Sequence, residues 1–280
     1  MIYRNWVFAI FLLFVYHMVS TAQQSVFSHY SVNNGLSQSV IKCIFQDSKG
    51  YIWFGTQQGL NRFNGYSFDN YLNNPADSNS ISDNWIYSIT EDNEGDIWIG
   101  TRNGLNKYVQ KTGQFKQYLY HASEPNSISG NYIYGLSKDT KGNILANTAT
   151  ALNIINPQTL AITKFVNPLV TGNEISDEGR PILQTRDGNI WLATADGLWY
   201  FDSDRKKFYL LDTLAKSNSL SNLNITALTE DSQANLWIGT QDGLNRLNLK
   251  NFAVSHYFLD PKRKENPNTC LLYTSPSPRD

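Results

Sequence analysis

Few residues of this 280-residue chain combine the side-chain types and the spacing that catalysis requires. No His-x-x-x-His or Glu-x-x-His pair is present, so the sequence predicts no metal site. It also lacks a Gly-x-Ser-x-Gly elbow for a nucleophile and any glycine-rich loop that would cradle phosphates. The histidines are far apart in the chain: His17, His29, His121 and His256. We therefore expect no catalytic residue, no metal and no cofactor.

One acidic cluster, Glu174, Asp177 and Glu178, lies outside the regular pattern of carboxylates. A hydrolase or lyase would need acids of this kind, held close together by the fold. The carboxylates that do follow the regular pattern stand in turns, where Asp accepts backbone N–H bonds. We favour a solvated loop over a catalytic dyad for this cluster.

Aromatic and basic residues at the start of five β-like runs form the candidate ligand site. Alternate residues of a strand share one face, and two such positions vary in chemistry between the runs. Aromatic rings beside Lys and Arg suit sugars, including acidic ones. Surface variation without function is the alternative for any single position. The candidates are Lys42, Trp85, Tyr87, Tyr132, Tyr134, Arg180, Asn224 and Thr226.

These runs belong to a unit that recurs five times. Its anchors are separated by 45, 47, 46 and 46 residues, and they are Trp53, Trp98, Leu145, Trp191 and Trp237. In most copies an Asp stands six residues before the anchor, and glycines stand three before and six after it. These positions predict two hairpin turns, and further apolar runs complete four antiparallel strands. A four-stranded repeat of this length is typical of a β-propeller blade.

The predicted fold is therefore all-β, a β-propeller with five four-stranded blades of a larger ring. We expect each anchor to be buried against the next blade, and the ring to stay open or aggregate when expressed alone. A closed five-bladed ring is the alternative. Residues 25–30 are expected to form a strand that completes a later blade, which is missing from this sequence. The blades are expected near residues 36–75, 81–122, 128–168, 175–214 and 220–260.

The two ends of the chain differ from the propeller region, residues 23–269. Residues 1–22 combine Arg4, an apolar run and small residues before Gln23, which predicts a cleaved secretory signal peptide. An uncleaved anchor is the alternative, and either predicts export. Residues 270–280 lack the repeat and are interpreted as a non-native tail, with a genuine carboxyl terminus as the alternative. A net charge of −1 gives no reason to expect nucleic-acid binding.

The segment from Ile86 to Tyr108, Ile-Tyr-Ser-Ile-Thr-Glu-Asp-Asn-Glu-Gly-Asp-Ile-Trp-Ile-Gly-Thr-Arg-Asn-Gly-Leu-Asn-Lys-Tyr, resembles the two-component regulator propeller repeat. The resemblance extends from residue 25 to about residue 269. It implies the periplasmic sensor region of a hybrid two-component histidine kinase that is anchored in the inner membrane, and a complete ring of seven blades. Such a region commonly senses oligosaccharides and controls genes for glycan use.

Three functions follow from these observations, in order of preference. The first is a periplasmic sensor for a small molecule or oligosaccharide, with the missing blades and downstream domains of the same protein as partners. A homodimer of the full-length protein would transmit the signal. The second is a secreted binding or adhesion propeller without a kinase, and the third is a propeller lyase.

Overall fold

The computed structural model describes residues 28–166, 178–211 and 219–258. The predicted signal peptide and tail lie outside these residues, as do Glu174 and Asp177. The chain divides into a short unit, Met1–Tyr30, and a large unit, Ser31–Asp280. Of the predicted strand at 25–30, only residues 28–30 are described, and they carry no strand. None of the described segments forms a helix with the length and apolarity needed to cross a membrane.

The large unit contains five antiparallel four-stranded sheets, each built from consecutive strands. This confirms the prediction of an all-β propeller with five four-stranded blades. The strands of blades one and two are β1 (Ile41–Gln46), β2 (Ile52–Thr56), β3 (Leu60–Phe63), β4 (Phe68–Tyr71), β5 (Ile86–Glu91), β6 (Ile97–Thr101), β7 (Gly104–Val109) and β8 (Gln114–Tyr118). Those of blade three are β9 (Ile133–Lys138), β10 (Ile144–Thr148), β11 (Ala151–Ile155) and β12 (Ile162–Val166). Those of blades four and five are β13 (Ile182–Gln184), β14 (Ile190–Thr194), β15 (Gly197–Asp202), β16 (Lys207–Leu210), β17 (Ile225–Glu230), β18 (Asn235–Thr240), β19 (Gly243–Asn248) and β20 (Val254–Tyr257).

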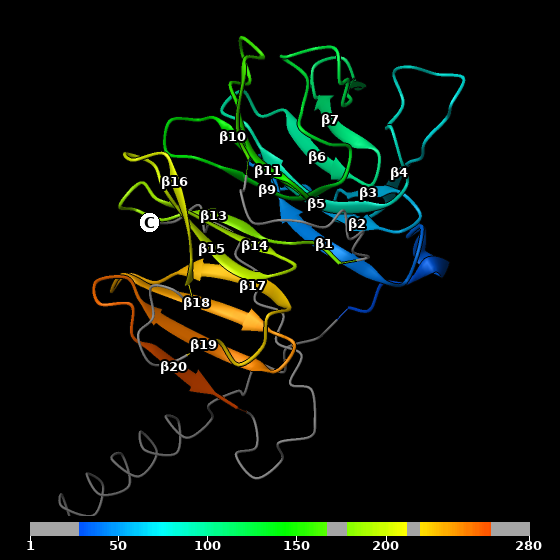
Figure 1. Ribbon diagram of the computed structural model, residues 1–280. Coiled ribbons are helices and arrows are strands. Elements are labelled where there is room, and N and C mark those ends of the chain that lie inside the picture. Colours follow the sequence, from blue (N-terminus) through cyan, green and yellow to red (C-terminus); the bar gives the residue numbers. More distant parts are fainter. Residues whose placement is uncertain (1–27, 167–177, 212–218, 259–280) are drawn as a thin grey trace, which may run out of the picture. The chain divides into compact units, whose positions relative to one another are not determined.

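The first strand of each blade contacts the first strand of the next blade. These contacts join β1 to β5, β5 to β9, β9 to β13 and β13 to β17, so the first strands are innermost (Figure 1). The fourth strand is the outer edge of each sheet. Residues at equivalent positions of successive first strands therefore lie side by side, as the candidate ligand site requires. The expected total of seven blades stays a prediction.

The first four anchors pack against the blade that follows each of them, as predicted, whereas among the described residues the fifth does not. Trp53 is fully buried in one cluster with Ile81 and Ile86 of blade two. The same pattern joins Trp98 to blade three, Leu145 to blade four and Trp191 to blade five. In blade five, the Trp237 ring lies tilted against Tyr257 of its own blade, with the ring centroids 5.5 Å apart, and is partly exposed. Burying such a ring contributes about 2–3 kcal/mol, so these anchors help to hold neighbouring blades together.

The Asp before each anchor does more than form the predicted turn. In blade one, Asp47 accepts a 2.8 Å hydrogen bond from the indole Nε1 of Trp53, besides bonds from two backbone N–H groups. Equivalent 2.8 Å bonds tie Asp92 to Trp98 and Asp231 to Trp237. The carboxylate therefore fixes both the turn and the ring that packs on the next blade.

A second repeated network joins the segment before the first strand to the second and third strands. In four blades a Ser N–H donates to an Asn side-chain oxygen at 2.8–3.0 Å, and the Asn amide donates back to the Ser hydroxyl at 2.7–2.9 Å. The same Ser hydroxyl lies 2.8–3.2 Å from a Thr hydroxyl. The triplets are Ser37–Thr56–Asn61, Ser82–Thr101–Asn106, Ser129–Thr148–Asn153 and Ser221–Thr240–Asn245. Blade four instead has Trp199 at the Asn position.

Candidate functional site

The candidate ligand residues of the first four blades meet at the innermost strands. Tyr87 on β5 and Tyr134 on β9 lie with their ring centroids 5.3 Å apart. The guanidinium of Arg180 lies 4.6 Å from the centroid of the Tyr134 ring, within the range of a cation–π contact. Lys42 on β1 forms a 2.9 Å ion pair with Glu178, which precedes β13 in blade four. A side chain from each of blades one to four thus contributes to one cluster.

The segment from Glu178 to Pro181 crosses the first strands of blades two and three. The Arg180 N–H donates a 3.0 Å hydrogen bond to the carbonyl of Tyr134. A Cβ added to Gly135 would lie 2.1 Å from the Arg180 carbonyl oxygen, so only glycine permits this approach. A Cβ on Gly179 would lie 3.3 Å from the Tyr87 carbonyl. The irregular start of blade four therefore occupies the innermost space of the unit.

This crossing segment separates the candidate residues into a buried layer and an accessible layer. Tyr87 and Tyr134 are 3% and 1% exposed, so their rings form the buried layer and are not open to a ligand. Trp85 and Tyr132, two positions earlier, are partly exposed. Tyr132 stacks on Tyr134 at 6.1 Å, and the guanidinium of Arg102 lies 5.1 Å from the Trp85 ring. The surface open to a ligand therefore combines two aromatic faces with basic groups.

The candidates of blade five stand on the neighbouring inner strand. Asn224 is exposed just before β17 and donates a 3.0 Å hydrogen bond to Gln241 of its own blade. Thr226 lies on β17 and is half-buried. The compact cluster contains residues of blades one to four. Asn224 and Thr226 belong to the next blade in the ring, before and on its first strand.

The chemistry available at these inner strands is that of recognition. The partly exposed rings of Trp85 and Tyr132 offer faces for an apolar or sugar ring, and the Lys42–Glu178 pair offers a charge of each sign. The described part of the chain contains no cluster of three or more His, Cys, Asp or Glu side chains arranged to hold a metal ion.

The repeat motif itself was compared with known families. A family model described as "Two component regulator propeller" matches residues 35–58, 80–103 and 219–242, in blades one, two and five. The chain carries two-component regulator propeller repeats. The matched residues run from before the first strand to the second strand, which is the part of each blade that contains the Ser–Thr pair, the turn Asp and the anchor Trp.

A curated relative of this regulator propeller is histidine kinase P4 of Formosa agariphila, which is 43% identical over 70 residues. The match covers 24% of this chain and 5% of the kinase. Among solved structures, the extracellular domain of a protein described as a hybrid two-component system from B. thetaiotaomicron superposes with a TM-score of 0.69 at 23% identity. That match covers 82% of this chain and 32% of the other. The propeller thus spans under a third of either relative.

A second structural neighbour of the regulator propeller is an enzyme. Virginiamycin B lyase from Staphylococcus aureus matches with a TM-score of 0.60 at 19% identity, covering 81% of this chain and 73% of the lyase. At this identity the likeness shows the shared fold alone. The lyase alternative therefore gains no residue-level support.

Sequence reasoning missed the role of the crossing segment. Glu178 was expected in a solvated loop, and its side chain is 64% exposed, but its ion pair with Lys42 was not predicted. The irregularity of blade four was the available signal, since its first strand lacks the apolar residue found six positions before the turn in the other blades. Gly179 stands there instead, and its lack of a Cβ allows the crossing.

Proposed function

We propose that this chain is the exported ligand-sensing region of a hybrid two-component sensor histidine kinase. The observation that supports this most is the regulator propeller repeat in three blades, together with the 43% identity to a histidine kinase over 70 residues. In this proposal the region lies in the periplasm, and a parent protein anchored in the inner membrane carries the kinase. A rigid propeller would pass the signal by rearranging a homodimer.

The ligand we propose is an oligosaccharide, bound over the accessible layer of the inner strands. Trp85 and Tyr132 supply ring faces, and Arg102 and Lys42 supply positive charge nearby. A ligand carboxylate could replace Glu178 as the partner of Lys42, because Glu178 is itself largely exposed. We therefore expect acidic sugars to bind better than neutral ones at this position. Control of glycan-use genes would follow from that signal.

Calorimetric titration of the full chain with uronic-acid oligosaccharides tests the ligand. Trp85→Ala and Tyr132→Ala should each weaken binding by about 10-fold, the loss of roughly 1.4 kcal/mol. Tyr66→Ala is the matched control, because Tyr66 is 95% exposed in the β3–β4 turn and touches none of the candidate residues. Affinity that is unchanged in both inner-strand variants would refute the assignment.

The signalling part of the proposal has a separate test. Sequencing the gene that encodes this chain should reveal a transmembrane segment and a histidine kinase in the same reading frame. A gene without either would favour the secreted binding or adhesion propeller.

A further inference from the structure

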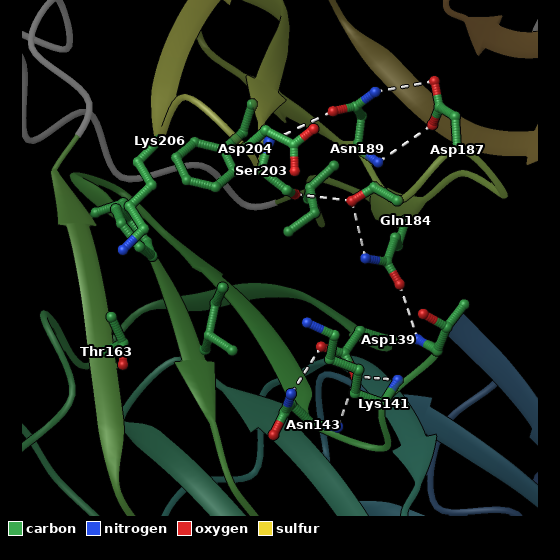
Figure 2. A pocket seen from close by; sticks show the side chains of 16 residues that line it. Asp139, Lys141, Asn143, Thr163, Gln184, Asp187, Asn189, Ser203, Asp204 and Lys206 are labelled. Atoms are coloured by element: carbon green, nitrogen blue, oxygen red, sulfur yellow. Dashed lines mark hydrogen bonds between the residues drawn. The ribbon is translucent and has the colours of Figure 1, made fainter.

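A cleft between blades three and four is distinct from the inner-strand site. Its volume is about 380 Å³, and both blades contribute to its walls (Figure 2). Blade three supplies Lys141 and Asn143 from its first hairpin turn and Thr163 from β12. Blade four faces them with Asp204 and Lys206 from the turn between β15 and β16.

The cleft follows from two replacements in blade three. Blades one, two and five have a Trp anchor and, nine residues later, an Arg or Lys. In blade one the guanidinium of Arg62 lies 5.7 Å from the Trp53 ring, and in blade two Lys107 lies 5.4 Å from the Trp98 ring. Blade three has Leu145 as its anchor and Ile154 at the basic position, and Ile154 lines the cleft. Two large side chains that fill this space elsewhere are thus replaced by smaller ones.

The lower part of the cleft is apolar and aromatic. Phe165 on β12 and Phe201 on β15 lie with ring centroids 4.7 Å apart, and Ile154 and Ile190 line the cleft beside them. Phe201 is only 2% exposed, whereas Phe165 is half-buried and presents part of its ring. An apolar ring face at the base of a polar cleft is suited to the C–H face of a sugar ring.

The polar groups of the cleft are held in place by bonds to one another. Asp139 accepts hydrogen bonds from the backbone N–H of Asn143 at 2.7 Å and from its side-chain amide at 2.8 Å. Gln184 connects the two blades, because it accepts a 2.8 Å bond from the Thr140 N–H and donates a 2.9 Å bond to the Gly188 carbonyl. These groups are ordered before any ligand arrives, which lowers the entropy cost of binding.

The charges on the cleft walls nearly balance. Three aspartates, at positions 139, 187 and 204, face two lysines, at positions 141 and 206. Asp139 and Asp187 are committed to bonds within their own turns. The groups left at the rim are Asp204, Lys206, Lys141 and Thr163, a mixture of donors and acceptors with little net charge. Such a rim matches hydroxyl groups, which both donate and accept.

We propose that this cleft binds a small neutral polyhydroxylated molecule, of the size of about one or two sugar units. The proposal is independent of the sensor function, because the cleft shares no residue with the inner-strand site. Hydroxyl groups of the ligand bond to Asp204, Lys206 and Thr163, and its less polar face covers Phe165.

Filling the cleft tests the proposal. Ile154→Arg restores the residue type that the same position has in blades one and five, so the strand should accept it. Ile154→Val is the matched control, since it leaves the cleft open. The probes are the methyl glycosides of β-glucose, β-galactose and α-mannose, followed by saturation-transfer NMR on the full chain, and thermal melting verifies that each variant is folded. We expect at least one glycoside to bind, and Ile154→Arg to weaken it by at least about 10-fold while Ile154→Val does not.

A second variant keeps the test decisive if Ile154→Arg does not fold. Lys206 has a left-handed backbone, with φ of 54°, so Lys206→Gly removes the ammonium group without straining the turn. This variant should weaken the same glycoside by a few-fold. Binding that is equal in wild type and in the folded variants, or no binding of any probe, would overturn the proposal. Loss of binding in Tyr132→Ala alone would place the glycosides at the inner strands, and would overturn the cleft while sparing the sensor function.

Discussion

Replacing Thr185 with Asp and Asp187 with Lys would give blade four the turn that blades one and three already have. The turn backbone is the same in both cases: the N–H of Thr185 bonds to the carbonyl of Asn189 at 2.9 Å, as that of Asp47 bonds to Tyr51 at 3.0 Å. An Asp at position 185 would therefore reach the indole of Trp191. The change at 187 is needed because the Asp187 carboxylate now accepts a 2.6 Å bond from the Thr185 hydroxyl.

The gain can be estimated from what the Trp191 indole lacks. Its Nε1 is buried without a hydrogen-bond partner among the described residues, whereas the other three anchor indoles each donate to an Asp at 2.8 Å. A hydrogen bond to a charged acceptor contributes about 1.5–3 kcal/mol, and burying the new carboxylate offsets part of this. We expect the free energy of unfolding to rise by about 1–2 kcal/mol and Tm by roughly 3–6 °C.

Calorimetry or urea denaturation of the double variant would measure this gain. Thr185→Ser is the control for changing the position alone, and it should leave Tm unchanged. Repeating the double substitution in a Trp191→Phe background removes the donor, so the gain should disappear. An unchanged Tm, or a gain that survives in that background, would refute the hydrogen-bond reasoning.

Three further predictions concern single residues. Trp98→Ala should lower the free energy of unfolding by about 3–5 kcal/mol in urea denaturation, because it leaves a cavity between blades two and three. Burial raises the pKa of Asp92, but hydrogen bonds from Trp98 and Lys107 outweigh it and lower the pKa below 3.8. Its stabilising contribution is thus present above pH 3.8 and lost as pH falls through the lowered pKa; Asp92→Asn should remove that part of the acid dependence of Tm. Burial raises the pKa of Cys43 to about 12, so in a Cys270→Ser background a thiol reagent at neutral pH should label only the unfolded chain.

The fold was predictable because it repeats. Five anchors at nearly constant spacing indicated a ring of blades, and the five four-stranded sheets confirm it. The order of the strands also followed, since tight turns with Asp and Gly join neighbours in sequence. With the first strands innermost, Lys42, Tyr87 and Tyr134 had to lie near one another, and the structure places them so.

The hydrogen-bond networks were not predicted, although their residues are visible in the sequence. The Asp before the anchor was predicted only to form a turn. In blade one, one carboxylate oxygen of Asp47 does accept a bond within the turn, but the other accepts a bond from Trp53, six residues away on the next strand. The bond between Ser37 and Asn61 spans 24 residues and depends on the sheet register. A search for polar residues that keep their spacing from the anchor would have found both.

Which candidate side chains on the inner strands are exposed could not be predicted from the sequence, for a different reason. Tyr87 and Tyr134 are buried, and Gly179 and Arg180 of blade four lie against their backbone carbonyls. This segment stands at the same repeat positions as the start of the other first strands, but Gly179 replaces the apolar residue there, so a comparison of the repeats did not predict its path. The residues left accessible, Trp85 and Tyr132, were among the candidates, but the sequence alone gave no reason to rank them first.

Blades three and four contain most of the departures from the repeat, and the cleft lies between these two blades. Buried indole nitrogens of Trp191 and Trp199 lack partners within the described residues, at a cost of about 1–3 kcal/mol each. Ile154, which lines the cleft, stands where blades one, two and five have an Arg or Lys. Natural proteins break local rules chiefly where function requires it. The irregular pair, blades three and four, is therefore where we expect substitutions to change ligand binding in the cleft with the least effect on the packing of the regular blades.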